Sequence, residues 1–191
     1  MEGMKSIFSA IMLIGAALII ALSVAAFIVQ SYQVDGESME PTLQDNDRLI
    51  VNKVPRTLAR ITDKPYIPAR GDIIIFNQNG SFDASGNGQK QLIKRVMALP
   101  GERVSVTSGI ITVYNREHPS GYRPDSTGDY NINRGASAGS LEITLADDEI
   151  FVAGDNRPNS EDSRYFGAIN ADDIVGKLIL RILPADKARR F

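Results

Sequence analysis

The chain has 191 residues, with 21 Lys and Arg against 23 Asp and Glu, and a formal net charge of −2. This length allows one membrane segment and one domain of roughly 100–150 residues, and the charge gives no broad attraction to nucleic acid. The absence of cysteine and the single histidine, His118 in a polar stretch beside a proline, exclude thiol nucleophiles, disulfides and a histidine-rich metal site, so we expect no cofactor or metal.

Residues 6–29 form a continuous apolar run without a charged side chain. A membrane-spanning helix needs about 20 apolar residues, whereas the apolar core of a cleaved signal peptide has only about 7–15. Residues 23–25 resemble a small-x-small cleavage site, but they lie inside the run. A buried soluble helix would normally carry a polar stripe, and none is visible. We therefore predict an uncleaved, single transmembrane anchor over residues 6–29.

The orientation of this anchor follows from its flanking cations. Residues 1–5 carry Lys5 and the amino terminus, whereas residues 30–47 contain no Lys or Arg. Because cytoplasmic flanks are enriched in cations, we predict a cell-membrane protein with residues 1–5 in the cytoplasm and the rest of the chain, after the anchor, outside it.

After the anchor, short runs rich in Val, Ile and aromatic residues alternate with Gly, Pro and Asn, which is typical of strands and turns. The predicted strands cover residues 48–54, 72–77, 91–99, 103–107, 110–114, 149–153 and 175–183. Ser108-Gly109, between two of them, indicates a hairpin turn. No helical periodicity of useful length stands out after residue 30, so we predict an all-β or mostly β domain.

Two polar segments interrupt these strands. Residues 78–90 contain two Asn-Gly pairs and are interpreted as a hairpin tip, and residues 115–140, rich in Gly, Ser, Pro and Asn, as a loosely structured insertion. We expect no chemistry in either segment. The β-rich core is then formed by residues 30–114 and 141–184, and residues 185–191 are a C-terminal tail.

Two side chains in this core are candidates for chemistry. Ser38 lies in a turn flanked by Gly and Pro, which can present a hydroxyl beside backbone N–H groups. Lys94 shares its strand face with the apolar residues Leu92 and Val96, and burial can lower a lysine pKa by up to about 3–5 units, which would make the amine a base. Taken alone, the residues favour an ordinary turn serine for Ser38 and, slightly, a lysine that snorkels to water for Lys94.

A third polar cluster follows the strand at residues 149–153. It is the segment 151–167, which offers internal ion pairs and hydroxyl groups from Asp155, Arg157, Ser160, Asp162, Ser163 and Arg164. Such a segment can hold a reactive pair rigidly. The simpler interpretation is a capped surface loop.

Four motifs in a fixed order resemble one known family closely. They are residues 36–43 (GESMEPTL), 70–76 (RGDIIIF), 93–104 (IKRVMALPGERV) and 154–164 (GDNRPNSEDSR). Together with the apolar run that precedes them, they resemble the bacterial type I signal peptidases, which are membrane-anchored serine/lysine leader peptidases. The resemblance extends to about residue 184. It implies a catalytic domain built as an antiparallel β-sheet, barrel-like, with a small inserted subdomain.

The resemblance also implies roles for individual residues. By the motif positions, Ser38 is the nucleophile and Lys94 the general base of a serine endopeptidase that forms an acyl-enzyme, and the Ser160 hydroxyl orients Lys94. The remaining supporting residues are two ion pairs, Asp162 with Arg164 and Asp155 with Arg95.

The substrates implied by the resemblance are secretory preproteins, cut after a small-x-small motif. The apolar side chains expected to line the substrate pockets are Val34, Met39, Leu43, Leu92 and Ile93. Membrane lipid and a functional link to the protein export machinery are the other implied partners, with no nucleic acid. Gly36 replaces a serine that assists the oxyanion site in some family members.

Two other functions remain open at this stage. One is a noncatalytic, membrane-tethered binding or assembly factor on the same scaffold, which would be expected to lack the Ser38 and Lys94 pair. The other is a serine/lysine peptidase that cleaves itself, as in self-cleaving repressors. The anchor and the lack of a helical DNA-binding domain count against the second.

Overall fold

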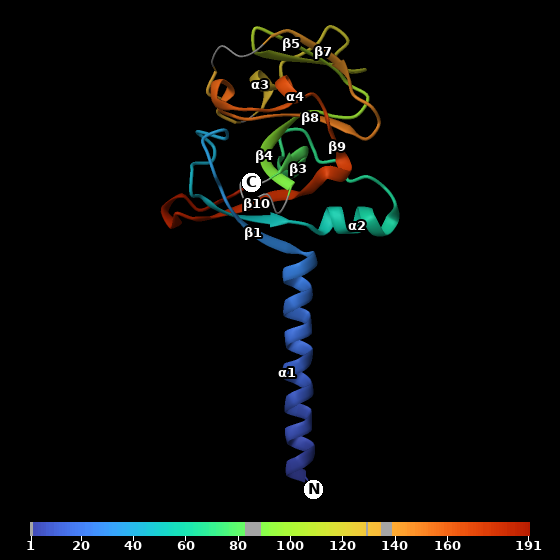
Figure 1. Cartoon of the computed structure of the whole chain (residues 1–191), viewed down its shortest axis with the longest axis vertical. Coiled ribbons are helices and arrows are strands. Elements are labelled where there is room, and N and C mark those ends of the chain that lie inside the picture. Colours follow the sequence, from blue (N-terminus) through green and yellow to red (C-terminus); the bar gives the residue numbers. More distant parts are fainter. Residues whose placement is uncertain (1, 83–88, 129, 135–138) are drawn as a thin grey trace.

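A long helix extends away from a β-rich domain, with the amino terminus at its far end and the carboxyl terminus in the domain (Figure 1). This computed structural model describes the chain except residues 1, 83–88, 129 and 135–138. Within its helices and strands, the side chains of residues 2–5, 8, 24–27, 81 and 82 are also outside the described part.

The long helix is α1 (Glu2–Phe27), with 26 residues. Among its described side chains, the exposed large apolar residues are Ile7, Ile11, Met12, Leu13, Ile14, Leu18, Ile19, Ile20 and Leu22. The predicted anchor, residues 6–29, falls partly on side chains outside the described residues, namely those of residues 8 and 24–27. Over the described residues, no helix is both long and apolar enough to cross a membrane.

The larger sheet has eight antiparallel strands. Seven follow one another across the sheet in the order β1 (Val29–Gln33), β2 (Arg48–Asn52), β10 (Ile174–Leu183), β3 (Ile73–Phe82), β4 (Gln89–Ala98), β8 (Glu149–Ala153) and β9 (Ile169–Asn170). The eighth, β11 (Arg189–Arg190), pairs with β10. The predicted mostly β fold is confirmed.

A smaller sheet of three strands contains β6 (Ile110–Tyr114), β5 (Arg103–Thr107) and β7 (Leu141–Thr144), in that order. Ser108 and Gly109 connect β5 to β6 with φ angles of +50° and +78°. Positive φ at both central residues defines the two-residue turn that matches strand twist, so the predicted hairpin is confirmed. The apolar faces of this sheet and of β4 and β8 share one buried cluster.

The predicted strand ranges agree with β5, β6 and β8 and overlap β2, β3, β4 and β10, but β1, β7, β9 and β11 were not predicted. The expectation of no helix beyond residue 30 is wrong, because α2 (Val54–Thr62) follows β2. The pattern that marks α2 covers only nine residues, too few to stand out in the sequence. Five single-turn helices complete the fold: α3 (Pro124–Thr127), η1 (Arg157–Asn159), α4 (Ser163–Phe166), η2 (Ala171–Asp173) and η3 (Ala185–Lys187).

Candidate active site

Ser38 and Lys94, 56 positions apart in the chain, meet at hydrogen-bond distance. Lys94 Nζ lies 2.7 Å from Ser38 Oγ and 3.0 Å from the carbonyl oxygen of Ile93. Lys94 lies within β4 and is 2% exposed, whereas Ser38 is half-buried in the turn that follows β1. The snorkelling interpretation of Lys94 is therefore wrong, because its ammonium end does not reach water.

The turn that carries Ser38 is held from two sides. Met39 and Leu43 are fully buried beneath it, and the Leu43 N–H donates to the Met39 carbonyl at 2.9 Å. On the other side, the Asn156 N–H donates to the Ser38 carbonyl at 3.0 Å, and its side-chain amide donates to the Glu37 carbonyl at 3.1 Å. These contacts attach the Ser38 turn to the segment that follows β8 and fix the hydroxyl beside Lys94.

Burial sets the protonation state of Lys94. Desolvation lowers its pKa from 10.5 to about 8, with Asp162 opposing this shift as the next largest influence. Among the described residues, no carboxylate forms an ion pair with the amine. A lysine without a counter-ion in a low-dielectric site favours its neutral form, so a substantial fraction of Lys94 can act as a base slightly above neutral pH.

Arg95, the next residue of β4, lies on the opposite face and is fully paired. Its guanidinium donates from Nε to Asp155 Oδ1 at 2.8 Å and from Nη2 to Oδ2, and from Nη1 to the Gly71 carbonyl at 2.8 Å. Thr42 also donates to Asp155, and the Tyr130 ring lies 4.2 Å from the guanidinium carbon. The two neighbouring cations of β4 therefore have different environments.

Asp162 and Arg164 form a second buried pair, each with a fully buried side chain. Arg164 Nε donates to Asp162 Oδ1 at 2.7 Å and Nη2 to Oδ2 at 2.8 Å. Asp162 also accepts from the Gly154 N–H at 2.9 Å and caps α4 by accepting from the Arg164 N–H. Asp162 therefore connects Gly154, directly after β8, with the start of α4, and so fixes the conformation of the segment between them.

Ser160 is buried, and its Oγ has no hydrogen-bond partner among the described residues. The hydrogen bond expected between Ser160 and Lys94 is thus not formed in this structure. Gly154 lies between the two segments: a Cβ on it would be 2.2 Å from Ser160 Oγ and 2.4 Å from the Ser38 carbonyl oxygen. Only glycine permits this approach, which brings the Ser38 turn and the Ser160 loop together.

A cavity of about 110 Å³ opens beside the Ser38–Lys94 pair. Of the five residues predicted to line substrate pockets, Val34, Leu92 and Ile93 lie in its wall. Met39 and Leu43 do not line it, because they pack in the core beneath the turn. The sequence analysis did not identify the remaining wall residues, which are Tyr32, Gln33, Asp35, Leu49, Ile75 and Gln91.

The segment 115–140, where no chemistry was expected, contacts the site loop through its described residues. Asp125 accepts two hydrogen bonds from the buried Arg157 guanidinium, one of them at 2.6 Å from Nη2. Asn133 donates to Asn156 at 2.9 Å, and Tyr130 covers Arg95. No motif in the sequence marks these residues. Over the described residues, no group of three or more His, Cys, Asp or Glu side chains is placed to hold a metal ion.

Comparison with known proteins identifies the family. Residues 7–183 match the family model described as signal peptidase, peptidase S26. The chain is 33% identical to signal peptidase I of Leptolyngbya laminosa, over 98% of this chain and 81% of that protein. It is 31% identical to signal peptidase IB of Staphylococcus aureus strain COL, over 94% of this chain and 91% of that protein.

The chain therefore belongs to the signal peptidase family S26. It is accordingly an enzyme, a hydrolase of the signal peptidase I type. The family predicted from the four sequence motifs is confirmed, and the noncatalytic assembly factor and the self-cleaving repressor are not supported.

Proposed function

We propose that this enzyme removes signal peptides from secretory preproteins after a small-x-small motif, with Ser38 as nucleophile and Lys94 as general base. The observation that carries this proposal is the 2.7 Å contact between Ser38 Oγ and a lysine that is 2% exposed. A hydroxyl is a weak nucleophile until a neighbouring base accepts its proton. Lys94 is the one titratable group hydrogen-bonded to Ser38 in the described part of the chain.

The reaction begins with neutral Lys94 accepting the Ser38 proton as Oγ attacks the carbonyl carbon of the scissile peptide bond. The protonated lysine then gives this proton to the departing amine, which leaves an acyl-enzyme ester on Ser38. A water molecule, deprotonated by the same lysine, attacks the ester and releases the acid product. Because neutral Lys94 is required, kcat/KM rises with pH through about 8.

The oxyanion of each tetrahedral intermediate needs hydrogen-bond donors. The backbone N–H of Ser38 is the donor that the motif implies, and Gly36 offers no hydroxyl. The N–H of Gly36 already donates to Asp45 Oδ1 at 2.9 Å, so this group is occupied. A missing donor costs about 2.7–4 kcal/mol of transition-state stabilisation, and we expect a second donor from the bound substrate or solvent.

The cavity beside the pair supports a preference for small side chains. Val34, Leu92 and Ile93 narrow it to about 110 Å³, which is small compared with typical ligand pockets of about 300–1,000 Å³. Such a cavity accepts an alanine methyl group and excludes larger side chains on steric grounds. The substrate position nearest the scissile bond is therefore expected to be small.

Membrane anchoring is part of this proposal. Among the described side chains of α1, nine large apolar ones are exposed, several of them by more than 60%, and lipid is the solvent in which such a surface is stable. We propose that residues 6–29 anchor the protein in the cell membrane, with residues 1–5 cytoplasmic and the catalytic core, residues 30–114 and 141–184, on the outer side. There it meets preproteins delivered by the export machinery.

Two variants of the full chain in detergent test the dyad. With Ser38→Ala or Lys94→Ala we expect no cleavage of a preprotein, while thermal unfolding shows a folded domain. Lys90→Ala is the matched control, since Lys90 is on the same strand but its side chain is 42% exposed, and we expect it to retain cleavage. Complete processing by the purified Ser38→Ala or Lys94→Ala protein would overturn the proposal.

A further inference from the structure

The start of α2 lies close in space to the carboxyl-terminal end of α1. The N–H of Lys53, which precedes α2, donates to the carbonyl of Ile28, which follows α1, at 2.8 Å. Figure 1 shows α2 lying crosswise to α1, on the side of the domain from which α1 emerges. The two helices therefore meet at one level of the molecule.

One face of α2 is apolar and uncovered. Val54, Leu58 and Ile61 are 36%, 57% and 76% exposed, and their spacing of four and three residues places them on one side of the helix. None of the nine residues of α2, all of them described, is buried. Exposed apolar side chains are ordinary when scattered, but a continuous stripe of three on an amphipathic helix indicates a contact surface.

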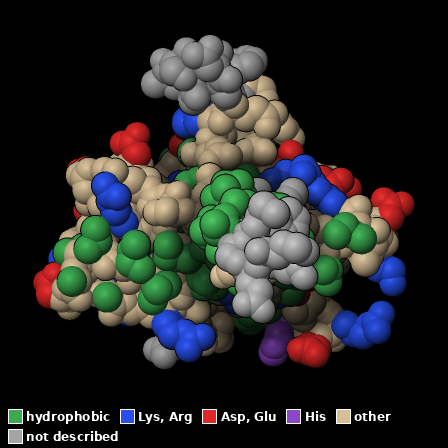
Figure 2. Space-filling model, turned by 90° about the horizontal axis from the view of Figure 1, so that it is seen from below, with side chains coloured by type: hydrophobic (Ala, Val, Ile, Leu, Met, Phe, Trp, Pro, Cys, Tyr) green, Lys and Arg blue, Asp and Glu red, His purple; other side chains and the backbone are tan. Residues whose placement is uncertain are grey.

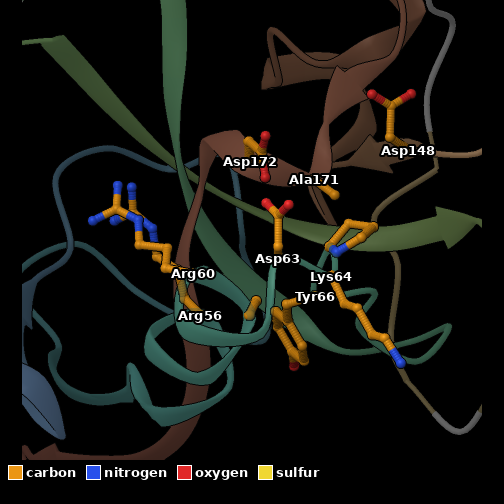
Figure 3. Close-up of a pocket in the computed structure, with 10 residues that line it drawn as sticks. Arg56, Arg60, Asp63, Lys64, Tyr66, Asp148, Ala171 and Asp172 are labelled. Atoms are coloured by element: carbon orange, nitrogen blue, oxygen red, sulfur yellow. The ribbon is translucent and has the colours of Figure 1, made fainter.

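The polar face of α2 is turned toward the domain. Arg56 and Arg60 extend from it along a cavity of about 450 Å³ between α2 and two other segments, the turn that carries Asp148 and the helix η2 that carries Asp172 (Figure 3). Asp172 is among the carboxylates that interact favourably with the charge of Arg56. Because this face is directed at the domain, the apolar stripe on the opposite side is directed away from it, toward the side occupied by α1.

The surroundings of the stripe point to lipid as its occupant. Ile28, whose carbonyl accepts from the Lys53 N–H at the start of α2, is itself an exposed apolar residue, and along the chain it follows the exposed apolar side chains of α1. Figure 2, which views the molecule from the α1 end, shows hydrophobic side chains around the centre of this side of the molecule and farther out on it, with Lys and Arg side chains among them. Among α2 and the residues that follow it, Arg60 and Lys64 are exposed cations.

We infer that α2 is an interfacial helix that rests on the membrane surface beside α1. Its apolar stripe lies at the boundary of acyl chains and headgroups, as in other amphipathic helices that bind membranes. The inference rests on the proposed anchoring by α1. A second attachment would stop the domain from swivelling on α1 and hold the cavity beside Ser38 at a constant height above the bilayer.

The position of α2 can be measured with single labels, because the chain has no cysteine. The full-length Leu58→Cys protein is labelled with the fluorophore NBD and reconstituted in vesicles of phosphatidylcholine and phosphatidylglycerol, with and without brominated lipid. Ile110→Cys is the matched control, since Ile110 is an exposed apolar residue, 42% accessible, on β6 of the smaller sheet. Leu13→Cys reports on α1.

We expect blue-shifted emission and quenching by brominated lipid for the labels at positions 58 and 13, and neither for the label at 110. Quenching at 13 with a water-like, unquenched label at 58 would overturn the inference and leave the anchoring intact. No quenching at 13 would instead overturn the anchoring. A blue-shifted label at 58 that lipid does not quench would show a protein partner on the stripe, which also contradicts the inference.

Activity provides a second test. The double variant Leu58→Glu/Ile61→Glu should raise KM for a preprotein embedded in the same vesicles and leave kcat unchanged for a short soluble peptide in detergent. Ile110→Glu is the control and should change neither value. An unchanged KM for the embedded preprotein, or an equal loss on both substrates, would contradict a role of the stripe at the membrane.

Discussion

Lys94 and Arg95 are neighbours in β4, both are almost completely buried, and their environments are opposite. Arg95 has a carboxylate, Asp155, in bidentate contact, whereas within the described part of the chain the Lys94 amine is hydrogen-bonded to a hydroxyl and a carbonyl group. A buried cation with a counter-ion is a structural element, and one without it is driven toward its neutral form. In the proposed mechanism, the same strand thus supplies a structural ion pair on one face and the general base on the other.

The largest expected effect on stability comes from removing Asp155, the counter-ion of the buried Arg95. Asp155→Ala leaves the Arg95 guanidinium buried and unpaired, which should lower the free energy of unfolding by about 3–5 kcal/mol. Urea denaturation measures this change. Glu142→Ala is the control: its pair with Arg103 is exposed by 63% and 43%, so its loss should be under about 1 kcal/mol. Equal losses in the two variants would contradict the structural role of Asp155.

Gly154→Ala tests the contact between the two halves of the site. Its methyl group would meet Ser160 Oγ and the Ser38 carbonyl, so the Ser38 turn and the Ser160 loop must separate, which disturbs the contact between Ser38 and Lys94. A misplacement of about 1 Å can lower the rate about a hundredfold, and we expect a loss of that size in kcat/KM for preprotein cleavage. Gly139→Ala, where a Cβ meets nothing within 4 Å, should leave the rate unchanged. Wild-type kinetics for Gly154→Ala would refute this geometry.

Lys94→Met tests the cost of burying the base. The pKa of Lys94 is about 8 in the folded protein, against 10.5 for an ordinary lysine such as that of the unfolded chain. Between these pH values the unfolded chain therefore binds more protons, and the stability of the wild type rises with pH. Below pH 8 the full cost is present, and above 10.5 it is gone. Lys94→Met should therefore unfold at higher urea concentration at pH 7, with a gain of at most about 3 kcal/mol.

The same variant should show no such gain at pH 11, where the wild-type amine is neutral in both states. A constant difference in urea midpoint between pH 7 and pH 11 would mean that the gain comes from packing of the methionine and not from the charge of Lys94.

Most of the strands, and the opposite faces of Lys94 and Arg95, could be predicted because successive side chains of a strand alternate between its two faces. This alternation can be read from a few neighbouring residues. The contact between Ser38 and Lys94 was not, since nothing in the residues alone relates positions 56 apart, and only the family resemblance joined them. Tyr130 and Asp125 were missed for a related reason. They lie in a polar segment whose packing depends on Arg95 and Arg157, far away in the chain.

The smallest expected stability effect is that of Ser160→Ala. Its hydroxyl has no partner in the described residues, so its removal should change the free energy of unfolding by under about 1 kcal/mol. If Ser160 orients Lys94 during the reaction, the Ser160→Ala variant should show a lower kcat and a shifted midpoint of the pH–rate profile, with an unchanged Tm.

Ser163→Ala is the contrasting variant, because the buried Val152 N–H donates to Ser163 Oγ at 3.0 Å and would lose its partner. The cost should be about 1–3 kcal/mol. An unchanged pH–rate midpoint and kcat in Ser160→Ala would remove Ser160 from the mechanism.

The neutral base can be observed directly by NMR titration of the full chain in micelles, with lysine side chains isotopically labelled and the Lys94 signal assigned by its loss in Lys94→Met. We predict a Lys94 midpoint near pH 8, well below the value of about 10.4 that is usual for a lysine in water. A Lys94 signal with a midpoint near 10.4 would contradict the proposed role of Lys94 as the base of this peptidase.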